Sequence, residues 1–127
     1  MSKDKIELGL AGEIQAAEFL KNNGYRILGR NFKTNLGEID IIAKDKDCIC
    51  FVEVKTRTSQ DKGLPEESIT KNKQHKLSQL ALSYLKNKKL LDKSARFDVV
   101  SIFPDSTGEN KIEIIKNAFS LDSRYLY

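Results

Sequence analysis

The sequence contains no tryptophan, and aromatic residues make up only 8% of its 127 residues. A platform of stacked aromatic side chains that binds single-stranded nucleic acid is therefore disfavoured. The apolar runs are short, which argues against a membrane-spanning helix. The first residues lack the apolar stretch and cleavage site of a signal peptide, so we expect a cytoplasmic protein.

Cysteine and histidine are also scarce, being limited to Cys48, Cys50 and His75. Two residues apart on a predicted strand, the cysteines share a face but lie too far apart to form a disulfide easily. A structural zinc site needs further Cys or His ligands at set spacings. The remaining composition, 39% hydrophobic and 31% charged, is typical of a single soluble domain that spans residues 1–127.

Positive charge is concentrated on one segment of the chain. Between Lys71 and Lys93 there are seven lysines and one acid, Asp92, so this segment carries +6 although the whole chain carries only +4. A basic stripe beside acidic residues favours a polyanionic partner such as a nucleic acid. A solvated, lysine-rich helix face explains the stripe alone equally well.

The spacing of apolar residues predicts a helix, three strands, a helix and two strands. The first helix is expected at residues 5–22, with an apolar stripe of Ile6, Leu10, Ile14, Ala17 and Leu20, and the second begins near residue 68 or 70. The strands are expected at residues 25–32, 38–44, 48–57, 95–103 and 111–116, with a loop at 58–66. This order favours an α/β fold in which helices flank a central mixed β-sheet.

Charged residues stand on the predicted strands where apolar ones are expected. Strand alternation places Glu53 and Lys55 on the same face as Phe51, and it pairs Ile39 with Ile41 on the face opposite Asp40. If the two strands are neighbours, Asp40 lies beside Glu53. Two close carboxylates repel each other, and a hard divalent cation such as Mg²⁺ would resolve the conflict. A cross-strand salt bridge on a solvated face is the alternative interpretation.

Glu13 lies within the apolar stripe of the first helix, where burial should exclude a carboxylate unless the interior needs it. Gly9 and Gly12 flank the same turn, and they would permit a close backbone approach. The alternative is that Glu13 belongs to the first turn of a helix that begins after Gly12, where acidic residues are common.

Lysines occupy the start of the second helix, where the helix dipole favours anions. Lys71, Lys73 and Lys76 there could cradle phosphate groups, and Gln74 could donate a hydrogen bond to them. Arg30 and Arg57 would extend the basic surface, although ordinary solvated side chains explain them as well.

Five stretches together carry a family resemblance: residues 9–17 (GLAGEIQAA), 37–43 (GEIDIIA), 51–57 (FVEVKTR), 96–100 (RFDVV) and 117–119 (NAF). This ordered set resembles the YraN-like family of bacterial proteins. That family is similar to archaeal Holliday junction resolvases in the PD-(D/E)-x-K superfamily of restriction-endonuclease-like nucleases. The resemblance spans residues from about 8 to 119, with Ile39 in place of the proline of the superfamily signature.

The resemblance implies a restriction-endonuclease-like fold and a role for each matching residue. It makes Asp40 and Glu53 ligands of Mg²⁺, or of Mn²⁺, together with the backbone carbonyl of Val54. It makes Lys55 the lysine of the signature. Glu13 and Gln74 match further positions near the active site, and Lys73 matches another such position on the second helix.

The resemblance further implies a metal-dependent endonuclease that hydrolyses branched or repair-related DNA as a homodimer, with no small-molecule cofactor. A non-catalytic DNA-binding or scaffold protein that retains the fold is the alternative, and RNA as the substrate stays open. The intact set of Asp40, Glu53 and Lys55 favours the enzyme, because a scaffold would be expected to lose one of them.

Replacing Lys73 and Lys76 with Ala should weaken binding to DNA, because each lysine that neutralises a phosphate releases a counterion. The salt dependence of the dissociation constant, measured by fluorescence anisotropy on labelled duplex, should become flatter. An unchanged salt slope would place the DNA-binding surface elsewhere on the molecule.

Overall fold

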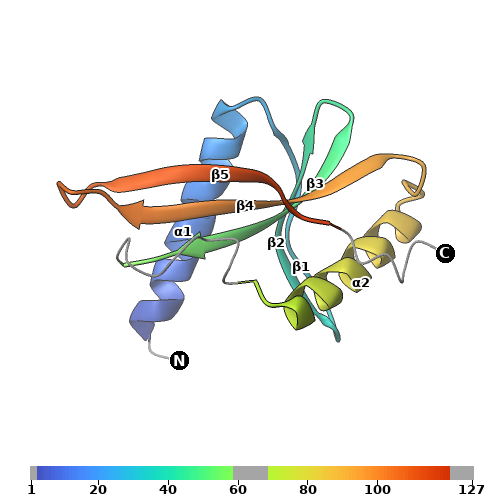
Figure 1. The fold of residues 1–127 in the computed structure, drawn as a ribbon, viewed down its shortest axis with the longest axis horizontal. Coiled ribbons are helices and arrows are strands. Elements are labelled where there is room, and N and C mark those ends of the chain that lie inside the picture. Colours follow the sequence, from blue (N-terminus) through green and yellow to red (C-terminus); the bar gives the residue numbers. More distant parts are fainter. Residues whose placement is uncertain (1–2, 59–68, 121–127) are drawn as a thin grey trace.

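The computed structural model describes residues 3–58 and 69–120, and within the first helix the side chains from Gly9 onward. In chain order the elements are α1 (Lys3–Asn22), β1 (Arg26–Thr34), β2 (Gly37–Asp45), β3 (Cys48–Thr56), α2 (Lys71–Asn87), β4 (Ser94–Pro104) and β5 (Asn110–Phe119). This is the predicted order (Figure 1). The loop predicted at residues 58–66 lies outside the described residues, apart from Thr58.

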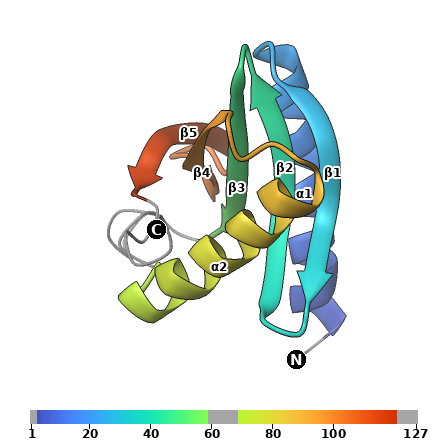
Figure 2. The ribbon, with the colours of Figure 1, turned by 90° about the vertical axis from the view of Figure 1, so that its right-hand side faces the viewer.

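The described strands form one mixed sheet in which the spatial order equals the chain order. β1, β2 and β3 form an antiparallel meander, β3 pairs with β4 in parallel, and β5 returns antiparallel to β4. Parallel neighbours need a crossover connection, and α2 lies within it. The two helices cover opposite faces of the sheet (Figure 2).

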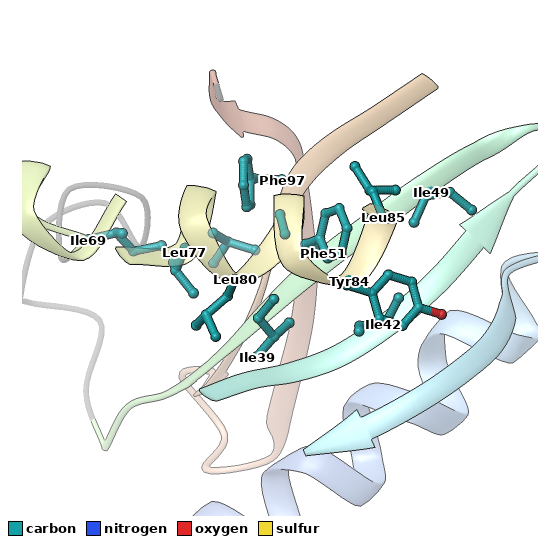
Figure 3. Packing of buried hydrophobic residues seen from close by; sticks show 12 residues of the cluster. Ile39, Ile42, Ile49, Phe51, Ile69, Leu77, Leu80, Tyr84, Leu85 and Phe97 are labelled. Carbon is teal, nitrogen blue, oxygen red and sulfur yellow. The ribbon is translucent and has the colours of Figure 1, made fainter. Parts of the chain in front are cut away.

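Each face of the sheet carries its own apolar core. Residues of β2, β3 and β4 pack against α1 on one face, around Ala16, Leu20, Ile41, Cys50, Val52 and Val100. On the other face α2 packs over a more aromatic set that includes Ile39, Ile42, Phe51, Leu80, Tyr84 and Phe97 (Figure 3). The central strand β3 therefore alternates between two buried faces, as the sequence pattern predicts.

The apolar stripe predicted for α1 is only partly correct. Ala17 and Leu20 are buried as expected, but the side chains of Leu10 and Ile14 are 52% and 55% exposed. The helix turns its small residues toward the sheet instead, because Gly12 lies against Thr56 of β3 and no larger residue fits there. Among the described residues, no helix is long and apolar enough to cross a membrane.

The prediction that Ile39 and Ile41 share a face of β2 is wrong. Ile39 packs in the core under α2, whereas Ile41 packs in the core under α1. Opposite this point β1 is irregular, because Asn31 has a φ of 54° between the register pairs Arg30–Ile41 and Phe32–Ile39. A left-handed residue in a strand interrupts the regular alternation of side chains. The irregularity falls at Asp40.

A buried polar network lies near the amino ends of β3 and β4. Asp98 is fully buried and accepts hydrogen bonds from Arg96 Nε (2.9 Å) and from the backbone N–H of Asn117 (2.9 Å). The Arg96 guanidinium also donates to Tyr25 Oη (3.0 Å) and to Asp45 Oδ2 (2.8 Å). The stretches at 96–100 and 117–119 thus contribute a satisfied structural network that joins β2, β4 and β5 to Tyr25, the residue before β1.

The two glycines of α1 should respond oppositely to substitution by Ala. A Cβ at position 12 would overlap Thr56 Oγ1, so Gly12→Ala should lower the free energy of unfolding by about 1–3 kcal/mol. A Cβ at position 9 meets nothing within 4 Å, so Gly9→Ala should raise the same quantity by about 0.5–1 kcal/mol through helix propensity. Urea denaturation measures both, and equal effects would contradict the close approach at Gly12.

Candidate metal and active site

Asp40 lies where the pairing of β2 with β3 ends. The antiparallel ladder runs from Asp45–Cys48 to Ile41–Val52 and is not continued beyond that pair. There Asp40 Oδ2 accepts a hydrogen bond from the backbone N–H of Val54 at 2.8 Å. The Asp40 carboxylate thus accepts the backbone N–H of the central strand at Val54, the residue between Glu53 and Lys55. This hydrogen bond fixes Asp40 beside these two side chains.

Glu53 is surrounded by lysines on the face that α2 covers. Its side chain is only 12% exposed and borders an apolar recess lined by Ile39, Phe51 and Leu77. Glu53 Oε1 lies 2.9 Å from Lys73 Nζ and 3.9 Å from Lys55 Nζ. The crossover helix therefore brings a cation of its first turn to the carboxylate at the carboxyl end of β3.

A second group of carboxylates reaches Asp40 from the side of α1. Single carboxylate oxygens of Glu13, Glu38 and Asp40 all lie within 4.8 Å of one another. The Asn31 amide, with its nitrogen turned toward the acids, donates to Glu38 Oε1 (2.8 Å) and Glu13 Oε2 (3.0 Å). Arg30 Nη2 lies 3.8 Å from Glu13 Oε2. Asp40 is thus the member that joins this group to Glu53.

The electrostatics of the site favour a bound cation. Burial and the neighbouring charge of Glu53 raise the pKa of Asp40 to about 7, although the hydrogen bond from Val54 acts in the opposite direction. Burial and the charge of Glu38 also raise the pKa of Glu13. Clustered acids with raised pKa values are typical of a site that needs a positive ion to become fully ionised.

The two lysines have shifted pKa values of opposite sign. Burial and the neighbouring Lys73 ammonium lower the pKa of Lys55. Burial also acts to lower the pKa of Lys73, but the hydrogen bond to Glu53 and the charges of Glu53 and Asp40 together raise that pKa. Lys73 is therefore the principal ion-pair partner of Glu53, and Lys55 lies beside that pair.

The donor set suits a hard divalent cation. Mg²⁺ and Mn²⁺ bind carboxylate and carbonyl oxygens. Among the described residues, the carboxylate oxygens that lie close enough together to share an ion are those of Glu13, Glu38 and Asp40. Glu53 is a charged neighbour of Asp40. The described part of the chain provides no Cys or His ligand in this acidic group. The residues present therefore fit the magnesium-type ion that the resemblance implies.

The structure brings most of the predicted site residues together. Asp40, Glu53 and Lys55 converge with Glu13, and Lys73 and Arg30 join them through ion pairs. Gln74 instead donates its side-chain amide to the carbonyl of Ile69 at 3.0 Å, which secures the start of α2.

The remaining residues of the predicted DNA-binding surface lie on α2 and directly after β3. Lys71 and Lys76 are exposed on α2. Arg57 follows β3 directly, and its backbone N–H donates to the carbonyl of Ile102 at 2.8 Å.

Sequence reasoning missed Glu38 and Asn31. Glu38 lies two residues from Asp40, so strand alternation could have placed the two carboxylates on the same face. Asn31 carries a weaker signal, since asparagine inside a predicted strand is a common left-handed residue and indicates a local irregularity.

The described part of the chain has a fold of the predicted α/β class, with two helices and a five-stranded mixed sheet in the predicted order. The protein in the solved structure "Crystal structure of SSO0001" superposes with a TM-score of 0.50 at 22% identity, over 98% of this chain. This chain spans only 57% of that protein, and at this identity the likeness concerns the fold alone.

The family follows from the sequence comparison. The family described as "Uncharacterised protein family UPF0102" matches residues 12–102, and the chain belongs to it, as the YraN-like resemblance indicated. The UPF0102 protein of Trichlorobacter lovleyi is 46% identical over 122 residues, covering 95% of this chain and 96% of that protein. The UPF0102 protein of Caldicellulosiruptor saccharolyticus is 49% identical over 117 residues, covering 91% of this chain and 99% of that protein.

Asp40→Asn should stabilise the metal-free protein in alkaline solution. Because the folded-state pKa of about 7 lies above the usual 3.8, the stability associated with protonated Asp40 is lost as the pH rises through about 7. An uncharged amide avoids this loss, so the free energy of unfolding at about pH 8 should rise by about 1–3 kcal/mol in the variant. The difference should become smaller as the pH falls below about 7, and it should disappear only below the unfolded pKa of 3.8. Urea denaturation with a chelator present measures this difference in the free energy of unfolding between the variant and the wild type.

Asp45→Asn is the matched control, because the pKa of Asp45 is lowered by its hydrogen bond with Arg96. That carboxylate contributes stability above its unfolded pKa and loses it as the pH falls, so the control should destabilise the protein at about pH 8. Destabilisation by both variants would contradict the repulsion at Asp40.

Proposed function

We propose that this protein is a magnesium-dependent endonuclease that hydrolyses phosphodiester bonds in branched or repair-related DNA. The observation that carries the proposal is the convergence of Asp40, Glu53 and Lys55 at the carboxyl end of the central strand. Charged groups this close are unfavourable unless they serve a function. The nuclease-like fold is compatible with this activity but does not establish it.

The proposed metal ligands are Asp40, Glu53 and the backbone carbonyl of Val54. When bound, Mg²⁺ polarises the phosphodiester and makes an attacking water more acidic. The hydrogen bond from the Val54 N–H orients Asp40 for this role before the ion arrives. Asn31 holds Glu13 and Glu38 beside Asp40, so these acids would receive hydrogen bonds from water next to the metal.

Lys55 is the proposed catalytic cation. Its side chain extends from the same face of β3 as Glu53 and lies against that carboxylate. An ammonium in this position can neutralise the negative charge that develops on a phosphate oxygen during the displacement. Because Lys55 is partly buried, its charge acts there with less screening by solvent than a surface lysine would have.

The DNA-binding surface that we propose continues from the site along the start of α2. Lys71 and Lys76 are exposed there, and Lys73 connects them to Glu53. Arg30 lies on the other side, beside Glu13. Cations placed around a metal site suit the phosphate backbone rather than base edges, so we propose recognition by backbone and shape. A DNA-binding protein without catalysis remains the second candidate.

Glu53→Gln and Asp40→Asn should each lower the rate of magnesium-dependent cleavage by about a hundredfold or more, since each removes a metal-binding charge. Folding and DNA binding should be largely retained. Calorimetric titration of Mg²⁺ or Mn²⁺ into the wild type and the Glu53→Gln variant measures metal binding. Cleavage is assayed in parallel on labelled four-way junction, flap and linear duplex DNA.

Glu18→Gln is a suitable control, because it removes one carboxylate from an exposed position on α1 where Glu18 pairs only weakly with Lys21. Normal cleavage by Asp40→Asn would eliminate the metal-ligand assignment. If the wild type neither binds metal nor cleaves any substrate, even with DNA present, the protein is a non-catalytic binding protein. Cleavage of RNA substrates alone would reassign the substrate.

A further inference from the structure

Two lysines share one oxygen of Glu53, and they are held by different elements. Lys55 belongs to β3, next to Glu53 itself, and its side chain is 23% exposed. Lys73 belongs to α2, and its side chain is 39% exposed while its ammonium lies 2.9 Å from Glu53 Oε1. The closer and more accessible of the two cations therefore comes from the helix that crosses over between β3 and β4.

The position of Lys73 in α2 is electrostatically unfavourable except for its contact with Glu53. Thr70 caps the helix by accepting a hydrogen bond from the backbone N–H of Lys73, and the first turn contains no acidic residue. The positive end of a helix dipole repels a cation there. An ammonium in this turn is retained by a negative partner, which is Glu53 in the present state.

A divalent cation on Glu53 would remove that partner. A second cation with twice the charge on Glu53 would repel the Lys73 ammonium and weaken its contact with Glu53 Oε1. The flexible four-carbon side chain of Lys73 allows the ammonium to move toward solvent. There it would meet a phosphate group of bound DNA, which the helix dipole also favours.

We propose that Lys73 is an exchangeable counter-cation of Glu53, which neutralises this carboxylate in the absence of metal and transfers to a DNA phosphate when a divalent ion binds. This inference rests on the proposed metal-dependent function of the same site. It predicts that Lys73 opposes metal binding in the free protein. It also predicts that metal and DNA strengthen each other's binding through Lys73, because such coupling is reciprocal.

The test compares Lys73→Gln with Lys76→Gln. Both variants lose one positive charge from the first turns of α2, and of these two lysines Lys73 is the one that forms the ion pair with Glu53. In calorimetric titrations with Mn²⁺ alone, Lys73→Gln should bind the ion about three- to tenfold more tightly than the wild type. Lys76→Gln should stay within about twofold, as expected for an exposed charge.

A second measurement records the affinity for duplex DNA with and without Mn²⁺. The factor by which Mn²⁺ strengthens DNA binding should be smaller in Lys73→Gln than in the wild type and unchanged in Lys76→Gln. Thermal unfolding checks that each variant is folded. If Lys73→Gln does not fold, Lys73→Arg should bind Mn²⁺ more weakly than the wild type, because a guanidinium pairs more firmly with a carboxylate.

Metal binding by the wild type with no gain in Lys73→Gln over Lys76→Gln would overturn the inference and leave the proposed metal site intact. Weaker Mn²⁺ binding by Lys73→Gln would also overturn it, since Lys73 would then hold Glu53 in its binding position. Absence of Mn²⁺ binding by the wild type, with and without DNA, would overturn both the inference and the proposed function.

Discussion

The parallel pairing of β3 with β4 is the constraint on which the rest of this structure depends. All nine residues of β3, from Cys48 to Thr56, have a partner in β4. Since parallel neighbours cannot be joined by a hairpin, the chain must cross over, and α2 lies in that crossover. The crossover covers one face of the sheet and brings Lys73 to Glu53. The core under α2 and one side of the candidate site therefore have the same topological origin.

Two polar groups, placed toward opposite ends of β3, differ in how their charge is balanced. Buried Asp98 is matched by Arg96, and its oxygens also accept hydrogen bonds from Tyr25 and the backbone of Asn117. At the other end, Asp40 has one backbone donor and several acidic neighbours, and its pKa is raised. A satisfied network stabilises a fold, whereas an excess of like charge reduces stability and is typical of a functional site. This contrast assigns the first group to structure and the second to chemistry.

The position of Asp40 depends on a local departure from regular strand geometry. The β2–β3 ladder ends at Ile41–Val52, and Asn31 adopts a left-handed conformation on the neighbouring strand. The irregularity turns Ile39 and Ile41 toward different cores, so Asp40 lies between the α1 face and the central strand. Its carboxylate can then contact Val54 while remaining near Glu13. Regular alternation would have directed these groups to separate faces.

The sequence by itself determined the order of elements and the alternating faces of β3, because these follow from local periodicity. It also placed Asp40 on the strand next to Glu53 and Lys55, whereas the irregularity that brings the Asp40 carboxylate to Val54 appears only in the structure. The orientation of α1 was decided only in the tertiary structure, where contact between Gly12 and Thr56 outweighs the apolar stripe of Leu10 and Ile14. Tertiary structure likewise decided the roles of Glu38 and Asn31 and the pairing of Lys73 with Glu53. The contacts of Gly12 with Thr56 and of Lys73 with Glu53 join residues far apart in the chain, and they depend on distances between packed elements that no local pattern encodes.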